Sequence, residues 1–190
     1  PDDGVPVTVC QFLKAADANV DLCRHSLGRI HKNAIKPVPR YLYLTLTADC
    51  NLRCKGCNYG RDFMPGHELE LELVRDAVDD AKAAGIERIR LYGGEPLIHR
   101  DLPKIVEYIA DRDMDMWMTT NAVLLKQRVD PLIEAGLRHI SVGFYGVGAD
   151  YDTYVQRPNR FQKVEQGIAY VREKYPDNVT MHLDWLLMRP

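Results

Sequence analysis

From residue 41 onward, the sequence alternates between short apolar stretches typical of strands and longer stretches with helical periodicity. The strand-like stretches are Tyr41–Thr47, Arg88–Tyr92, Met114–Thr119, Ile140–Phe144 and Val179–Met188. Two junctions repeat one pattern of helix end, glycine and strand start, Ala84-Gly85-Ile86 and Ala135-Gly136-Leu137. Such alternation predicts an α/β fold with parallel strands joined by right-handed crossovers. Every loop that follows a strand is then expected at one edge of the sheet.

Four helical segments are predicted between these strands. Apolar residues recur at helical spacing in the sets Leu71-Val74-Val78-Ala81, Ile105-Val106-Ile109 and Val164-Ile168-Val171. Asp101 is expected to cap the second helix, with Pro103 in its first turn. Asp130-Pro131 opens a further helix, with proline at the first helical position.

Residues 1–40 do not show this alternation of strands and helices, so we expect an N-terminal extension before a core at residues 41–190. A short helix is predicted around residues 20–30, and Lys36-Pro37-Val38-Pro39 reads as an extended lead-in. Cys10 and Cys23 are expected to be inert, because free cysteine often behaves as a small buried hydrophobe. The sequence ends directly after the fifth predicted strand. We therefore expect either a fragment, which we favour, or a sheet completed by another chain.

The charge balance indicates a soluble protein without a nucleic-acid or membrane surface. Lysine and arginine total 25 against 27 acidic residues. No apolar run approaches the length of a membrane span, and the first residues lack a secretory signal. Five cysteines, an odd number, fit a reducing cytoplasm better than a disulfide framework. A cytoplasmic enzyme is the resulting expectation.

Three of these cysteines stand close together directly after the first predicted strand. Cys50, Cys54 and Cys57 are separated by three and two residues in the run CNLRCKGC. Thiolates so spaced on one loop can converge on a single iron–sulfur cluster, and a four-iron cubane takes four ligands. Three thiolates leave one iron open to another ligand. The loop follows a strand, which is where open α/β sheets and barrels place their active sites.

A structural zinc site is the alternative interpretation of these cysteines, and it requires four nitrogen or sulfur ligands. A second Cys-x-x-Cys pair is absent from the sequence, and His67 is the candidate fourth ligand. The spacing favours the cluster. A zinc-binding module remains the non-enzyme alternative.

The cysteine triplet and the run Gly93-Gly94-Glu95-Pro96 after the second strand together resemble the motifs of the radical S-adenosylmethionine (SAM) superfamily. The resemblance spans about residues 41–188. It implies a partial (β/α)6 barrel, apparently truncated after the fifth strand. It also implies a [4Fe–4S] cluster on Cys50, Cys54 and Cys57, with SAM on the open iron.

In this family an electron, from a donor such as flavodoxin or ferredoxin, cleaves SAM at the cluster to give a 5′-deoxyadenosyl radical. That radical abstracts hydrogen from the substrate. The stretch Thr119–Leu125 is similar to one in subgroups that modify peptides and natural products, with Ala122 in place of the usual glycine. A peptide or natural-product substrate is therefore favoured. The alternative is a sugar or nucleoside substrate, handled by a decarboxylase, epimerase or dehydratase. Whether SAM is consumed, and whether an auxiliary cluster domain follows, stays open.

The resemblance also implies residues that contact SAM. Gly93 and Gly94 are expected to let backbone approach its methionine end, with Glu95 as a local polar anchor and Pro96 stiffening the turn. The residue before the third cysteine is commonly aromatic in the family, but here it is Gly56. Tyr59 is the hypothetical replacement that would pack on adenine.

Three further positions carry two interpretations each. Asn121 either hydrogen-bonds a ligand or caps a loop. Ser141 aligns with a serine that contacts the SAM ribose, although a strand serine is often bonded only to backbone or water. Arg157 stands where related enzymes have an arginine reaching the SAM carboxylate, an anion that suits a guanidinium, or it is a surface arginine.

The fifth strand supplies the candidates for contact with substrate. Alternation places His182 and Asp184 on one face and Met181, Leu183 and Trp185 on the other. His182 and Asp184 then face a ligand-filled interior or an exposed sheet edge. Tyr92 and Trp117 belong either to the core or to a cavity wall. Met114, Met116 and Met118 are expected to pack in the core.

Overall fold

The computed structural model describes residues 40–60 and 65–186. The predicted helix around residues 20–30, the proline-rich lead-in, Cys10 and Cys23 lie outside the described residues. The boundary at residue 40 between an extension and the core therefore stays a prediction.

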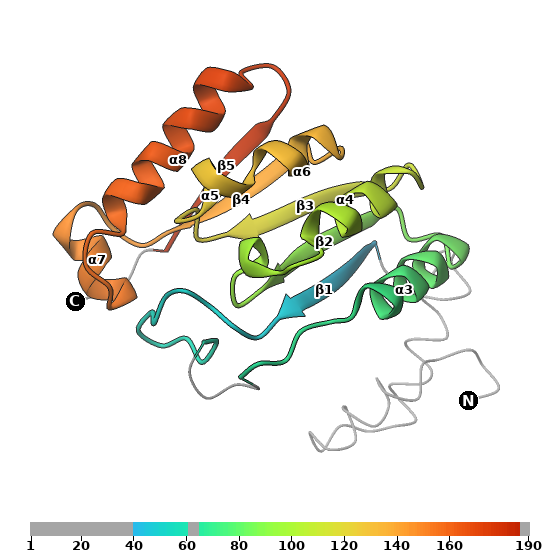
Figure 1. Cartoon of the computed structure of the whole chain (residues 1–190), viewed down its shortest axis with the longest axis horizontal. Coiled ribbons are helices and arrows are strands. Elements are labelled where there is room, and N and C mark those ends of the chain that lie inside the picture. The colour runs from blue at the N-terminus through green and yellow to red at the C-terminus, as the bar shows by residue number, and fades with distance from the viewer. Residues whose placement is uncertain (1–39, 61–64, 187–190) are drawn as a thin grey trace, which may run out of the picture. The chain divides into compact units, whose positions relative to one another are not determined.

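Five parallel strands form one sheet in which each strand lies beside its neighbours in sequence, as Figure 1 shows. They are β1 (Tyr41–Thr47), β2 (Arg88–Gly93), β3 (Asp115–Thr120), β4 (His139–Phe144) and β5 (Thr180–Trp185). Register is continuous except for an irregularity between Thr45 and Thr47 in β1. The prediction of an α/β fold with parallel strands is confirmed. Strand β5 is shorter than predicted, because it ends at Trp185 and Leu186 is outside it.

Helices fill every interval between strands. The four predicted ones are α3 (Leu71–Ala83), α4 (Leu102–Ala110), α6 (Asp130–Glu134) and α8 (Phe161–Lys174). Three short elements were not predicted, namely η1 (Pro96–Ile98), α5 (Leu125–Arg128) and α7 (Ala149–Val155). Within residues 40–60 and 65–186, no helix is both long and apolar enough to cross a bilayer.

Asp101 is the N-cap residue of α4, as predicted, but its carboxylate accepts no hydrogen bond from a backbone amide of the first turn. Its dihedral angles, φ −100° and ψ 13°, are not the extended ones of a typical capping residue. The carboxylate instead accepts a 2.7 Å hydrogen bond from the Lys104 ammonium group.

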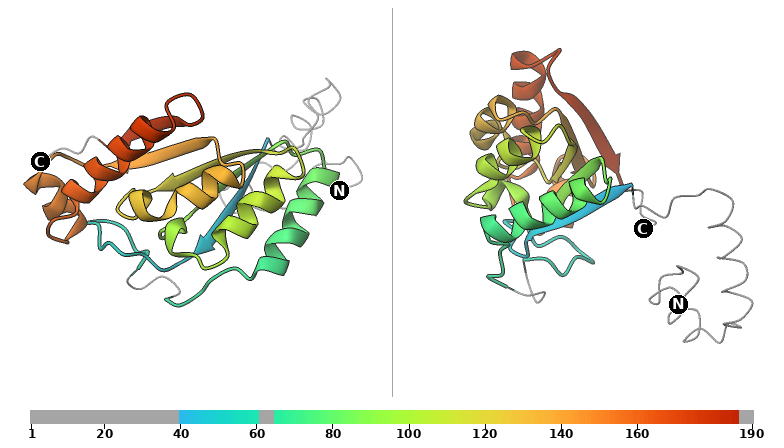
Figure 2. Two further views of the ribbon diagram at one scale, coloured as in Figure 1. Left: turned by 45° about the horizontal axis from the view of Figure 1, so that its top comes forward. Right: turned by 90° about the vertical axis from the view of Figure 1, so that its right-hand side faces the viewer.

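The helices lie on one face of the sheet, which Figure 2 shows edge-on in its right-hand view. Side chains of alternate strand positions point into this layer and form the apolar core. Fully buried examples are Leu46, Ile89, Leu91, Met118, Ile140 and Val142 from the strands, with Val78, Ile105, Ile109, Leu132 and Val164 from the helices. Met114 and Met116 are also buried, so the prediction that the methionines pack in the core is confirmed.

The opposite side of the sheet, which we call the open face, is not covered by any helix of the described residues (Figure 2). Its side chains are polar and aromatic where the core side is aliphatic. They include Tyr43, Arg90, Trp117, His139 and His182, which share this side by strand register. Aromatic rings and a guanidinium are groups that can contact ligands. The open face is therefore a candidate for binding other molecules.

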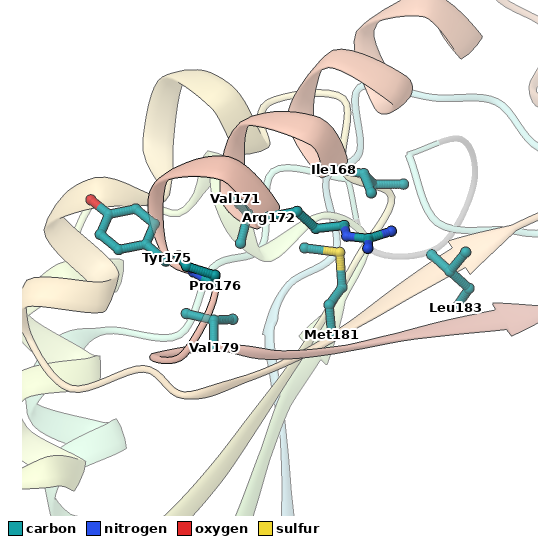
Figure 3. A pocket seen from close by; sticks show the side chains of 8 residues that line it. All are labelled: Ile168, Val171, Arg172, Tyr175, Pro176, Val179, Met181 and Leu183. Carbon is teal, nitrogen blue, oxygen red and sulfur yellow. The ribbon is translucent and has the colours of Figure 1, made fainter.

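A separate apolar groove lies on the helix side, between the end of α8 and strand β5 (Figure 3). Ile168, Val171 and Arg172 line it from the helix, and Met181 and Leu183 line it from the strand. Because Leu183 is 50% exposed, the helix side of β5 is incompletely covered. The groove carries none of the predicted site residues.

Candidate active site

The cysteine loop begins where β1 ends and is fixed by backbone hydrogen bonds at both ends. The amide of Gly60 donates to the Ala48 carbonyl at 3.0 Å, which closes the loop on itself. The amides of Arg53 and Lys55 donate to the carbonyls at the end of α7, at 3.0 and 2.9 Å. The loop is therefore attached to α7, an element about a hundred residues further along the chain.

Gly60 is a site residue that the sequence reasoning missed. It has a φ of +68°, and a β-carbon there would lie 2.8 Å from Cβ of Cys50. Only glycine fits both conditions. The available signal was its place three residues after Cys57, at the point where the loop must turn back.

The cysteine loop and the Gly93–Pro96 run are bonded directly to each other. The Gly94 amide donates to the Thr47 carbonyl at 2.8 Å, and the Glu95 amide donates to the Asp49 carbonyl at 2.9 Å. A β-carbon on Gly94 would overlap the carbonyl of Asp49, and one on Gly93 would overlap that of Thr47. These glycines are thus required for the approach of two backbone segments. The predicted approach to SAM remains a prediction.

Glu95 ties this run to the end of β3. Its side chain is fully buried and accepts hydrogen bonds from the Thr120 hydroxyl at 2.7 Å, the Asn121 amide at 2.8 Å and the Leu97 amide at 3.0 Å. Burial raises the pKa of this carboxyl group above its ordinary value, opposed by the three donors. The carboxylate is occupied by the chain itself, as expected for a local anchor. Pro96, which follows, is buried at the start of η1.

Asn121 connects β3 to the cysteine loop. Its side-chain nitrogen donates to the Asn51 side-chain oxygen at 2.7 Å and lies 3.7 Å from the sulfur of Cys50. Its side-chain oxygen accepts from the Val123 amide at 3.1 Å, which is the loop-capping contact that the sequence left open. Ala122 adopts a φ of +62°. This left-handed conformation is one that glycine adopts more readily than alanine.

The three cysteines are free thiols, each half-buried, on this one loop. Burial raises the pKa of Cys50 to about 11, and the hydrogen bond from the Leu52 amide opposes that shift. Within the described residues, no three side chains of His, Cys, Asp or Glu are gathered around the position of a single ion. A cubane cluster does not require three ligands around one ion, because each thiolate binds a different iron. The donor set therefore fits a cluster with three cysteine ligands.

His67, the proposed fourth zinc ligand, takes part in holding the loop. Its carbonyl accepts a hydrogen bond from the Ala48 amide at 2.9 Å, and its ring lies 3.3 Å from the Pro65 carbonyl. The structure does not bring its ring together with the three thiols as ligands of one ion.

The remaining cofactor candidates lie around the same edge of the sheet. Tyr59 is half-buried within the cysteine loop. Ser141 is buried in β4, in register with Thr119 and His182. Arg157 is half-buried just after α7, and its guanidinium donates to the Gln156 carbonyl at 3.2 Å. Their contacts with SAM stay predictions.

His182 and Asp184 lie on the open face, on the same side of β5 as predicted from alternation. The indole of Trp117 stacks between the rings of His139 and His182, with centroid distances of 5.0 and 4.8 Å. Asp184 pairs with Arg90 at 3.6 Å, and Arg90 also donates to the Thr119 hydroxyl at 2.9 Å. Trp117 is thus part of the open face rather than the core. The stack and the Arg90 pair were not visible in the sequence.

The profile of the radical SAM superfamily matches residues 44–185, which include both the cysteine loop and the open face. With that match added to the fold and the loop, the chain belongs to the radical SAM superfamily. Membership implies a [4Fe–4S] cluster and SAM as cofactors and supports the cluster over the zinc alternative. The resemblance found in the sequence is thereby confirmed at the level of the superfamily.

Among curated relatives, the chain is similar to GTP 3′,8-cyclases. The chain is 34% identical over 148 residues to a GTP 3′,8-cyclase of Syntrophomonas wolfei, covering 74% of this chain and 45% of that protein. It is 32% identical over 127 residues to a probable GTP 3′,8-cyclase of Archaeoglobus fulgidus, covering 67% and 43%. The chain spans less than half the length of these relatives.

Solved structures agree on the fold. The structure of anSMEcpe with bound AdoMet and a Kp18Cys peptide superposes with a TM-score of 0.61 at 18% identity, covering 75% of this chain and 42% of that one. BtrN in complex with AdoMet and 2-DOIA gives 0.53 at 18% identity, covering 76% and 56%. At such identity the likeness establishes the fold alone, a partial radical SAM barrel.

Proposed function

We propose that this chain is the cofactor-binding part of a radical SAM enzyme that acts on a nucleotide, as its GTP 3′,8-cyclase relatives do by name. The observation that carries the proposal is identity of 31–36% to several such cyclases over 58–81% of this chain. This reading corresponds to the nucleoside alternative of the sequence analysis.

In this proposal Cys50, Cys54 and Cys57 hold the cluster, and the backbone at Gly93–Pro96, Ser141 and Arg157 contacts SAM. When bound, the reduced cluster and SAM would supply a 5′-deoxyadenosyl radical that removes hydrogen from the substrate. The chain's own contribution is rigidity. Hydrogen bonds from Gly94, Glu95 and Asn121 join the ends of β1, β2 and β3, so the cysteines are held in one arrangement.

The open face offers groups that suit a nucleotide. Arg90 is oriented by Thr119 and Asp184, and a guanidinium matches phosphate oxygens. His182 presents a ring already stacked on Trp117, and ring surfaces of this kind stack on bases. His182 and Asp184 are accordingly proposed to contact substrate. Asp184 has the further effect of fixing Arg90.

The test is anaerobic reconstitution of the protein with iron and sulfide, followed by dithionite and SAM with GTP, ATP or no nucleotide. We expect GTP to increase 5′-deoxyadenosine formation and to yield a new nucleotide product, both followed by mass spectrometry. An Arg90→Gln variant should need more GTP for the same rate. An Arg75→Gln variant on helix α3, away from the site, serves as its matched control. Cluster-loaded protein whose SAM cleavage ignores every nucleotide would contradict the proposal.

A second candidate is the modification of a peptide or natural product. It is supported by the stretch Thr119–Leu125, although the curated relatives do not favour it. Under this alternative, SAM cleavage by the loaded protein would be stimulated by a peptide or natural-product fraction and not by GTP.

A further inference from the structure

Tyr145 occupies the carboxyl end of β4, beside the edge that carries the cysteine loop. It directly follows Phe144, the last residue of the strand, and its ring folds back over Gly143. A β-carbon on Gly143 would lie 2.6 Å from the Tyr145 hydroxyl oxygen and 3.1 Å from the ring carbon that bears it. Gly143 lies on the open-face side, in register with Asp184. The glycine therefore creates the space in which the ring lies.

A second ring supports the first. Tyr154 of α7 lies with its ring centroid 4.8 Å from that of Tyr145, at an interplanar angle of 35°. Its carbonyl accepts the 2.9 Å hydrogen bond from the Lys55 amide in the cysteine loop. Burial raises the pKa of both phenols. The hydrogen bond from Lys55 attaches Tyr154, and with it the pair of rings, to the cysteine loop.

Within residues 40–60 and 65–186, the hydroxyl groups of this pair make no hydrogen bond, whereas those of three other tyrosines do. The Tyr151 hydroxyl donates to the Asn121 carbonyl, and those of Tyr170 and Tyr175 donate to Asp130. Neither hydroxyl oxygen is fully enclosed by the described residues. The two half-buried phenols beside the cysteine loop are therefore accessible to a ligand.

We propose that Tyr145, backed by Tyr154, forms an aromatic wall of the adenosine site and stacks on the adenine of SAM. The inference rests on the proposed function, in that it takes SAM as the ligand. Adenine offers a flat ring, and stacking of a base on an aromatic side chain contributes about 1–3 kcal/mol. The cysteine loop has open space at Gly56, where no atom of the described residues would lie within 4 Å of an added β-carbon. Tyr145 supplies from β4 the ring that this position lacks.

Tyr59, the ring suggested by the sequence, is the competing residue. It lies next to Gly60, which packs against Cys50, whereas Tyr145 directly follows strand β4. Parallel substitution of the two tyrosines distinguishes them.

The experiment measures the Kd for SAM by equilibrium dialysis with radiolabelled SAM on the anaerobically reconstituted chain. Tyr145→Leu removes the ring and should weaken binding roughly 5- to 150-fold, the equivalent of the stacking energy. Tyr145→Phe keeps the ring and should change Kd by less than about threefold. Tyr59→Leu should bind as the wild type does.

Iron and sulfide content is measured on every variant, and Tyr108→Leu on helix α4 is the matched control. If Tyr145→Leu loads less iron than the wild type, Tyr145→Met, which also lacks a ring, replaces it. Wild-type affinity in a loaded ring-less variant overturns the inference, as does a loss confined to Tyr59→Leu. Failure of the proposed function is a separate result, because the loaded wild-type protein would then bind SAM but cleave it at a rate that no nucleotide changes.

Discussion

Among single residues of the site, Gly94 leaves the least space for a side chain. Without one, the backbone after β2 can approach the end of β1 and the cysteine loop, and two backbone hydrogen bonds form there. Gly60 has the same effect within the loop, against Cys50. Glycine in these places follows from contact between backbones, and a sequence shows only that a glycine is present.

We predict that Gly94→Ala destabilises the protein by at least about 2 kcal/mol, as overpacking against rigid backbone does, and prevents cluster assembly. Gly85→Ala is the matched control. Gly85 also has a positive φ, +82°, but no atom would lie within 4 Å of an added β-carbon, so only the backbone cost of about 1 kcal/mol applies. Urea unfolding and iron content report the two effects. Equal loss of stability in both variants would contradict the steric explanation.

At the scale of elements, helix α8 holds the end of β3 in place through α5. Gly167 is buried in α8, and a β-carbon on it would lie 3.0 Å from both the Ala122 carbonyl oxygen and Cβ of Leu125. The stripe Val164, Ile168 and Val171 was predictable from periodicity. The central role of Gly167 was not, because it depends on how closely α5 approaches.

We predict that Gly167→Val destabilises the protein by about 1–3 kcal/mol, since its added carbons have no room against Ala122 and Leu125. Ala169→Val, on the exposed side of the same helix, should cost less than about 1 kcal/mol through helix propensity alone. Thermal and urea unfolding give both values. A Gly167→Val protein as stable as Ala169→Val would show that α8 does not press on α5.

A second contact between elements links the start of α6 to the end of α8. The Asp130 carboxylate accepts hydrogen bonds from the Lys174 ammonium group and the Tyr170 hydroxyl, both at 2.7 Å, and from the Tyr175 hydroxyl at 2.9 Å. The bonds from Lys174 and Tyr170 lower the pKa of Asp130 below its ordinary value.

A lowered pKa means that the folded state prefers the ionised carboxylate, so its contribution is present at neutral pH and is lost as pH falls through the folded-state pKa. We predict that Asp130→Asn costs about 1 kcal/mol at pH 7. The difference from the wild type should shrink below about pH 4. Unfolding free energies of both proteins between pH 3 and 7 measure this, and a difference that is independent of pH would exclude the ionised carboxylate as its cause.

At the scale of the whole molecule, most of the fold was predictable from the sequence. Hydrophobic periodicity and turn residues mark each strand and helix in the sequence. Strands that alternate with helices then predict a parallel sheet. Short helices such as α5 and α7 were not predicted, because one or two turns show too little periodicity. The three cysteines could be proposed as cluster ligands from the sequence because their spacing is local. The hydrogen bonds through Glu95 and Asn121, and the stack on Trp117, could not be predicted from the sequence, because they join residues that are distant in it.

Electron paramagnetic resonance of the reduced, anaerobically reconstituted protein, with and without SAM, measures directly whether Cys50, Cys54 and Cys57 leave one iron open. We expect about four irons per chain and a spectrum that changes when SAM is added, both lost in Cys54→Ala. Stoichiometric zinc without iron, or a cluster that forms equally well in Cys54→Ala, would contradict the assignment.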